Sequence, residues 1–115
     1  MLAVNFITSE SNRDLLVTFS IASFTAKCLT VQRSPFVEVL LPKEARGASI
    51  VPLNRRDVAR DLLVSIKWFG SKVTIRTQRY RYRLDVSAVL ASQIAEAKAV
   101  LREMVIDGTA EMNEG

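Results

Sequence analysis

Arginine and tyrosine side chains alternate from Arg79 to Arg83, in the order R-Y-R-Y-R, and no other stretch of the chain has residue types and spacing so suited to binding chemistry. Guanidinium groups bind phosphate oxygens, and tyrosine rings offer flat faces on which nucleic-acid bases stack. Period-two alternation is typical of a β-strand, in which successive side chains point to opposite faces. On a single strand, the arginines would therefore lie on one face and the tyrosines on the other.

Positive charge is concentrated in the middle of the chain. Residues 55–83 hold nine Lys or Arg against two Asp or Glu, a net charge of +7, whereas residues 84–115 have a net charge of −4. Such a segment indicates a surface that faces a polyanion, so the sequence predicts an interface for single-stranded DNA or RNA. The predicted phosphate contacts are Arg55, Arg56, Lys67, Lys72, Arg76, Arg79, Arg81 and Arg83, and the predicted base-stacking residues are Trp68, Tyr80 and Tyr82.

The alternative is a protein–protein interaction or adaptor module. In that case the arginine strand would pair with carboxylates of residues 85–114, in this subunit or in a neighbouring one. A homodimer is expected in either case, since strand edges or a helix face must be covered. An enzyme is not expected, because the chain has no histidine and no glycine-rich phosphate-binding motif. Metal-ligand spacing is absent too, so neither a metal nor another cofactor is expected.

Composition indicates one ordinary globular domain. The chain has 115 residues, of which 49% are hydrophobic and 24% charged. The N-terminal residues lack the pattern of a signal peptide, and no apolar run approaches the roughly 18 residues that span a bilayer. The protein is therefore expected to be intracellular, cytoplasmic if its source is bacterial, with no membrane partner. The single cysteine, Cys28, excludes an internal disulfide and is expected to be buried.

The elements that must position the basic residues form an α+β domain over residues 1–108. We expect an antiparallel sheet of five to seven strands, with a long C-terminal amphipathic helix on one face. Alternation and turn residues predict strands over residues 2–7, 14–21, 24–31, 36–41, 49–51, 62–69 and 73–84. The strands at 62–69 and 73–84 are expected to form a hairpin.

Two features of residues 54–84 allow alternative interpretations. Residues 54–66 could instead form a helix capped by Asn54. The apolar positions also switch from odd to even numbers near Thr77, which a β-bulge or bend within one long strand would explain.

The C-terminal helix is predicted to start at a cap formed by Asp85 or Ser87 and to stop at Gly108. Apolar residues recur every three or four positions between these limits, which favours a helix packed on the sheet or against the same helix of a second subunit. Residues 109–115 are expected to be a short, acidic, flexible tail, in which Glu111 and Glu114 could fold back on the arginines.

Overall fold

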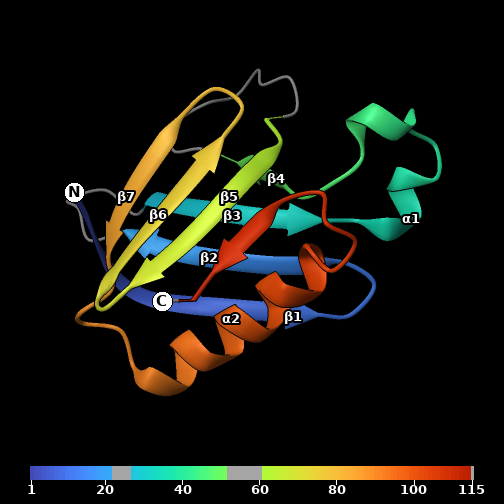
Figure 1. Ribbon diagram of the computed structural model, residues 1–115. Helices are drawn as coiled ribbons and strands as arrows, with labels where there is room; N and C mark the ends of the chain where they lie inside the picture. Colours follow the sequence, from blue (N-terminus) through green and yellow to red (C-terminus); the bar gives the residue numbers. More distant parts are fainter. Residues whose placement is uncertain (22–26, 52–60, 115) are drawn as a thin grey trace.

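Two halves of one bent sheet face each other across a shared apolar core in the computed structural model (Figure 1). The structure describes residues 1–21, 27–51 and 61–114. One half contains β1 (Leu2–Ser11), β2 (Leu15–Ile21), β3 (Lys27–Arg33) and β4 (Ser49–Val51). The other half contains β5 (Leu63–Phe69), β6 (Lys72–Thr77), β7 (Arg81–Asp85) and β8 (Glu111–Asn113). The helices are α1 (Pro35–Glu38), the 3-10 turn η1 (Lys43–Ala45) and the long helix α2 (Ala91–Met104).

The eight strands follow the order β4-β3-β2-β1-β7-β6-β5-β8. Most neighbours are antiparallel, but β1 pairs with β7 and β5 pairs with β8 in parallel. The sheet also curls back on itself, because Ser49 in β4 bridges to Leu62 and the main-chain NH of Leu63 donates to the oxygen of Ala48 at 2.8 Å. The predicted α+β class is confirmed. The expectation of an all-antiparallel sheet of five to seven strands is wrong in strand number and in the two parallel pairings.

The core lies between the two halves of the sheet and is closed on one side by α2. Fully buried side chains come from both halves, among them Phe19 of β2 and Ile75 of β6. Helix α2 packs against β1 and β2 and buries Leu101 and Met104 in the same core. None of the helices in the described part of the chain is long and apolar enough to cross a bilayer.

The sequence from Lys72 to Asp85 forms two strands joined by a tight reversal, and not one long strand with a bulge. Ile75 pairs with Tyr82, and Val73 pairs with Leu84, so each odd-numbered residue of β6 faces an even-numbered residue of β7. The switch of the apolar positions from odd to even numbers near Thr77 is therefore caused by a turn between two strands. The predicted hairpin between β5 and β6 is confirmed. The alternative helix over residues 54–66 lies outside the described residues as far as residue 60, and its last four residues belong to β5, which begins at Leu63.

Residues 36–41 form no strand, contrary to the prediction. Pro35 occupies the first turn of α1, where its fixed backbone angle suits a helix and its missing NH costs nothing. The chain then turns through main-chain bonds such as Leu40 NH to Val37 O at 3.0 Å. The side chains of Phe36, Val37, Val39 and Leu40 are exposed, and the segment does not join the described sheet.

The C-terminal region also differs from the prediction at both of its ends. Helix α2 begins at Ala91, because Val86 is buried and its NH donates to Ser71 O, which holds the residues before the helix in an irregular connection. The expected flexible tail contains β8, which pairs with Ser65 to Lys67 of β5. The cysteine on β3, Cys28, is exposed and not buried as expected.

Candidate nucleic-acid interface

Five basic side chains gather on the outer face of β5, β6 and β7. They line an open hollow of about 420 Å³, which we call the basic hollow, together with Ser65 and Thr74. The five residues are Lys67 of β5, Lys72 and Arg76 of β6, and Arg81 and Arg83 of β7. The tight reversal after β6 is what unites them, because a single long strand would have placed Arg76 and Arg81 on opposite faces.

The strand register fixes the layout of these cations. Arg76 lies directly across from Arg81, while Lys67 and Arg83 lie on either side of Thr74. Neighbouring strands are about 5 Å apart and alternate residues about 7 Å apart, so the positive charges cover a patch of roughly 10 by 13 Å. Like charges directly opposite each other on paired strands destabilise a sheet, so the fold itself gives no reason for the Arg76–Arg81 pair.

Asp61 positions the turn that carries the arginines. It is buried, and its carboxylate accepts a hydrogen bond from the Thr77 hydroxyl at 2.7 Å and one from the Arg79 NH at 3.2 Å. The turn closes through the Thr77 NH, which donates to Tyr80 O at 2.9 Å, and through the Tyr80 NH, which donates to the Thr77 hydroxyl at 3.0 Å. Because all these donors are satisfied, β7 is held firmly beside β6.

The basic hollow is short of compensating negative charge. Over residues 1–21, 27–51 and 61–114, none of its five cations takes part in an ion pair. The nearest acidic neighbour in the register is Asp85, which lies across from Lys72. Hydrogen bonds from Ser87 lower the pKa of Asp85, and the charge of Lys72 lowers it further. Glu114 pairs with Arg102 at 2.7 Å, so it does not fold back on the arginines of the hollow. Glu111 of β8 lies across from Ser65, beside the Lys67 edge of the hollow, and forms no ion pair with its arginines among the described residues.

The aromatic residues predicted to stack on bases lie away from this face. Trp68 is only 3% exposed and points into the core, where the Lys98 ammonium lies 5.1 Å from its ring centroid. Tyr82 is half buried and packs against the core on the side of the sheet opposite Arg81 and Arg83. The Tyr80 ring is 6.2 Å from that of Tyr82. In this fold Trp68 cannot offer its ring to a base, and the tyrosines do not line the hollow.

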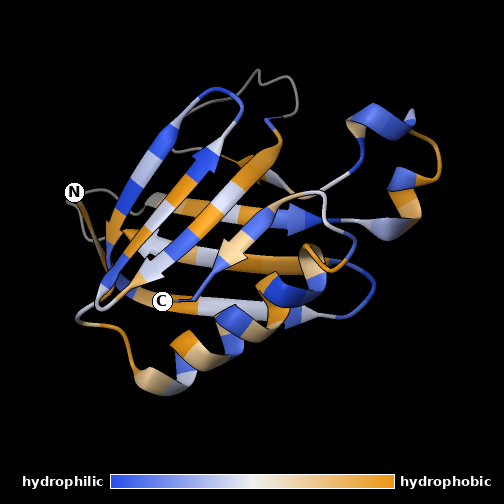
Figure 2. Ribbon diagram, viewed as in Figure 1, coloured by the Kyte–Doolittle hydropathy of each residue, from blue (hydrophilic) through white to orange (hydrophobic). Residues whose placement is uncertain are grey.

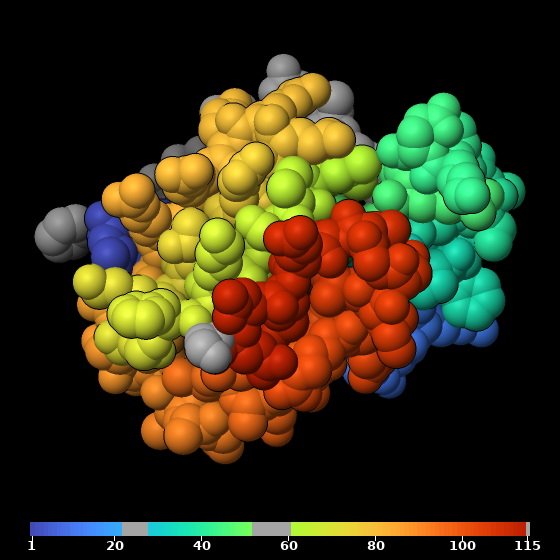
Figure 3. Space-filling view, in the orientation of Figure 1, coloured from blue at the N-terminus to red at the C-terminus, as the bar shows by residue number. Residues whose placement is uncertain are grey.

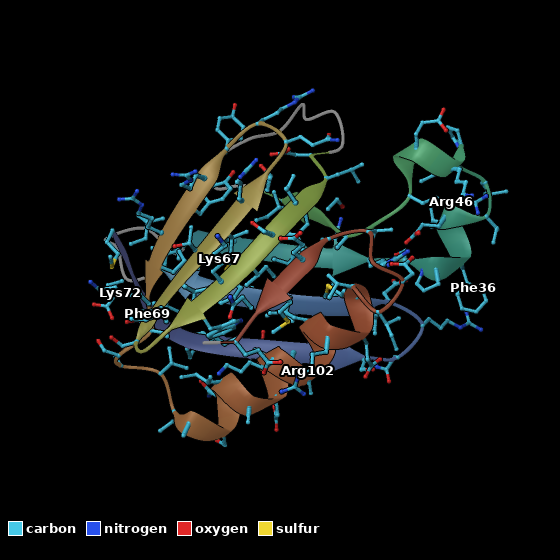
Figure 4. All side chains as sticks on the ribbon, viewed as in Figure 1. Phe36, Arg46, Lys67, Phe69, Lys72 and Arg102 are labelled. Atoms are coloured by element: carbon cyan, nitrogen blue, oxygen red, sulfur yellow. The ribbon has the colours of Figure 1, made fainter. Side chains whose placement is uncertain are left out.

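Phe69 is the aromatic residue that sequence reasoning missed. It is 80% exposed at the end of β5 and lies across from Lys72, next to the basic hollow (Figure 4). The sequence contains the pattern that places Phe69 on this face. Ser65, Lys67 and Phe69 alternate with apolar residues that point inward, so the ring belongs to the polar face of β5.

Three of the predicted phosphate contacts, Arg79, Arg55 and Arg56, are not among the described residues that line the hollow. Arg79 is exposed in the turn between β6 and β7, but its side chain does not line the hollow. Arg55 and Arg56 lie outside the described residues.

Among the described residues, no cluster of three or more His, Cys, Asp or Glu side chains is arranged to hold a metal ion. Comparisons of the chain with protein-family models, with curated proteins and with solved structures found no match.

Proposed function

We propose that this protein binds single-stranded nucleic acid, without catalysing a reaction on it, through the outer face of β5, β6 and β7. The observation that supports this most is the basic hollow, in which five cations meet with no ion-pair partner among the described residues. Phosphate oxygens would satisfy them, and the directly opposed Arg76 and Arg81 could each bind a phosphate group of the same strand. We place this activity inside the cell, where DNA and RNA strands are handled.

An unpaired strand suits the site better than a duplex. The exposed ring of Phe69 lies at the edge of the hollow, where a base could stack on it only if that base is free of its complement. The contacts are mainly to phosphates, which carry no sequence information, so recognition is expected to be weakly selective for sequence.

The test of this function is binding of a fluorescently labelled single-stranded oligonucleotide across a salt series. Each phosphate neutralised on a single strand contributes about −0.7 to the slope of log K against log salt, so five contacts predict a slope of about −3 to −4. A matched duplex is the control and is expected to bind more weakly at each salt concentration. Absence of binding at low salt would refute the proposal and leave a carboxylate-bearing protein partner as the ligand of the arginines.

Substitutions at Phe69 separate base stacking from purely electrostatic binding of the strand. Replacement by leucine removes the ring but keeps an apolar side chain, and it is expected to weaken oligonucleotide binding about tenfold, since base–aromatic stacking is worth ~1–3 kcal/mol. Replacement by tryptophan keeps the stacking surface and should preserve the affinity. Because Phe69 is 80% exposed, neither change should alter the unfolding midpoint. Equal affinity of the leucine and tryptophan variants would exclude stacking and favour purely electrostatic binding.

A further inference from the structure

The chain between β3 and β4 forms a protrusion that stands out from the sheet (Figure 3). It comprises residues 35–47, including α1 and η1. Part of its outer surface is apolar, since the side chains of Phe36, Val37, Val39 and Leu40 are all at least half exposed and Leu40 is 82% exposed. Its other exposed side chains include those of Lys43, Glu44 and Arg46. Figure 2 shows the same hydrophobic stretch at the outer end of the protrusion. Contiguous exposed side chains of this size mark a surface that another molecule covers.

A groove of about 620 Å³ lies between the protrusion and the end of α2. Apolar side chains line both of its sides, namely Leu15, Pro35, Val39 and Ile106. Ile106 follows α2 and is 85% exposed, so the wall formed by the body of the protein is uncovered as well. Val39 belongs both to the exposed apolar segment and to the groove, so the two adjoin as a convex and a concave part of one surface, in which apolar side chains lie among charged ones.

Arg33 holds the two sides of this groove in a fixed relation. Its guanidinium pairs with Glu38 of α1 at 2.7 Å and with Asp107, which follows α2, at 2.7 Å. It also donates a hydrogen bond to the main-chain oxygen of Met104. Because these contacts tie the protrusion to the end of α2, the surface is preorganised and loses little conformational freedom on binding.

We propose that this surface binds a second copy of the chain, with the protrusion of each copy lying in the groove of the other. A two-fold dimer requires one surface patch that is complementary to itself. The convex and concave parts meet this requirement because they lie side by side. The charges are complementary in the same way, since Lys43 and Arg46 lie on the protrusion and Glu103 lies on the opposite wall.

The dimer leaves the basic hollow of each copy open. Figure 4 shows Phe36 and Arg46 at one end of the molecule and Phe69 and Lys72 at the other. Two hollows would then be offered to one long strand, which raises its affinity relative to a strand that reaches only one. The dimer does not depend on nucleic-acid binding, and its test uses the protein alone.

The first test is the mass of the protein in solution, measured by light scattering and by sedimentation over a concentration series. We expect twice the 12.8 kDa chain mass at about 100 μM. Leu40→Asp should raise the dissociation constant at least about 30-fold, as expected for a central apolar contact. Leu90→Asp is the control, because Leu90 is also exposed but precedes α2, away from the groove. A wild-type monomer at this concentration, or a dimer that Leu40→Asp leaves intact, would overturn the proposal.

The second test examines the reciprocal arrangement directly. Lys43→Glu and Glu103→Lys should each weaken self-association, because each places like charges across both halves of the interface. An equimolar mixture of the two variants should form a heterodimer, since opposite charges would then meet in both halves of its interface. A mixture that remains monomeric would show that the protrusion does not enter the partner's groove, and so would contradict the proposal.

Discussion

Replacing Arg76 and Arg81 together with alanine is expected to weaken binding of a single-stranded oligonucleotide by at least about 100-fold. The two residues lie directly opposite each other in the basic hollow. Each is expected to make a charge-assisted hydrogen bond to phosphate, worth about 1.5–3 kcal/mol, and the two losses are expected to accumulate. The slope of log K against log salt should also become less steep by about 1.4, since two phosphate contacts are removed.

The same double substitution should leave the fold intact. Both side chains are exposed, and removing two like charges that face each other across a strand pair should leave the unfolding temperature unchanged or slightly higher. Arg79→Ala is the matched control for Arg81→Ala, because it removes the same charge two residues away from a side chain outside the hollow. Equal losses of affinity in these two single variants would mean that binding follows overall charge and not the geometry of the hollow.

The largest expected effect on stability comes from Arg33→Ala. Arg33 and Glu38 are nearly buried, with side-chain exposures of 11% and 8%, and they form a two-bond ion pair. Removing the guanidinium leaves the Glu38 carboxylate buried without its partner, which is expected to lower the free energy of unfolding by about 3 kcal/mol. Urea unfolding measures this loss. The double variant Arg33→Met/Glu38→Leu should recover most of it, because it removes both charges and keeps the space filled.

The Arg33 contacts also make stability depend on pH. The hydrogen bond from Arg33 holds the pKa of Asp107 well below its usual range. Because the carboxylate binds a proton less readily in the folded state than in the unfolded state, its contribution is complete above about pH 5 and is lost as the pH falls below the ordinary value of about 4. Asp107→Asn should therefore flatten the fall in stability between pH 5 and acid. An unchanged pH profile, or a loss below about 1 kcal/mol in Arg33→Ala, would show that these contacts contribute little.

Local patterns in the sequence were sufficient to predict the strands whose pairing partners are close in the chain. The hairpin around Gly70 follows from alternation in both arms and from a glycine with a φ of 58° at the turn. The reversal after β6 has no such glycine or proline. It depends on Asp61, which precedes β5, and no short-range rule links that carboxylate to Thr77.

Contacts between distant parts of the chain explain the other differences between the predicted and the observed elements. The apolar segment after Pro35 has the composition of a strand, but in the fold it pairs with no strand and its side chains are exposed. β8 is a three-residue strand of ordinary polar character that exists because β5 offers it an edge. The basic face was predictable from composition. The alternation in β5 also separates Phe69, beside Lys67, from the inward-pointing Trp68, but the packing of β5 on the core is what confirms which of the two rings is buried.

The parallel pairing of β1 with β7 has a consequence for the order in which the protein assembles. This pairing joins the residues around Leu2 to those around Leu84, so it can form only when the long stretch of chain between them is restricted to a loop, which costs conformational entropy. The β5–β6–β7 meander, in contrast, forms from neighbours in the sequence, and contacts of this kind form early in folding. The face that carries the basic hollow therefore belongs to the most local part of the topology, whereas its connection to β1 depends on pairing between distant parts of the chain.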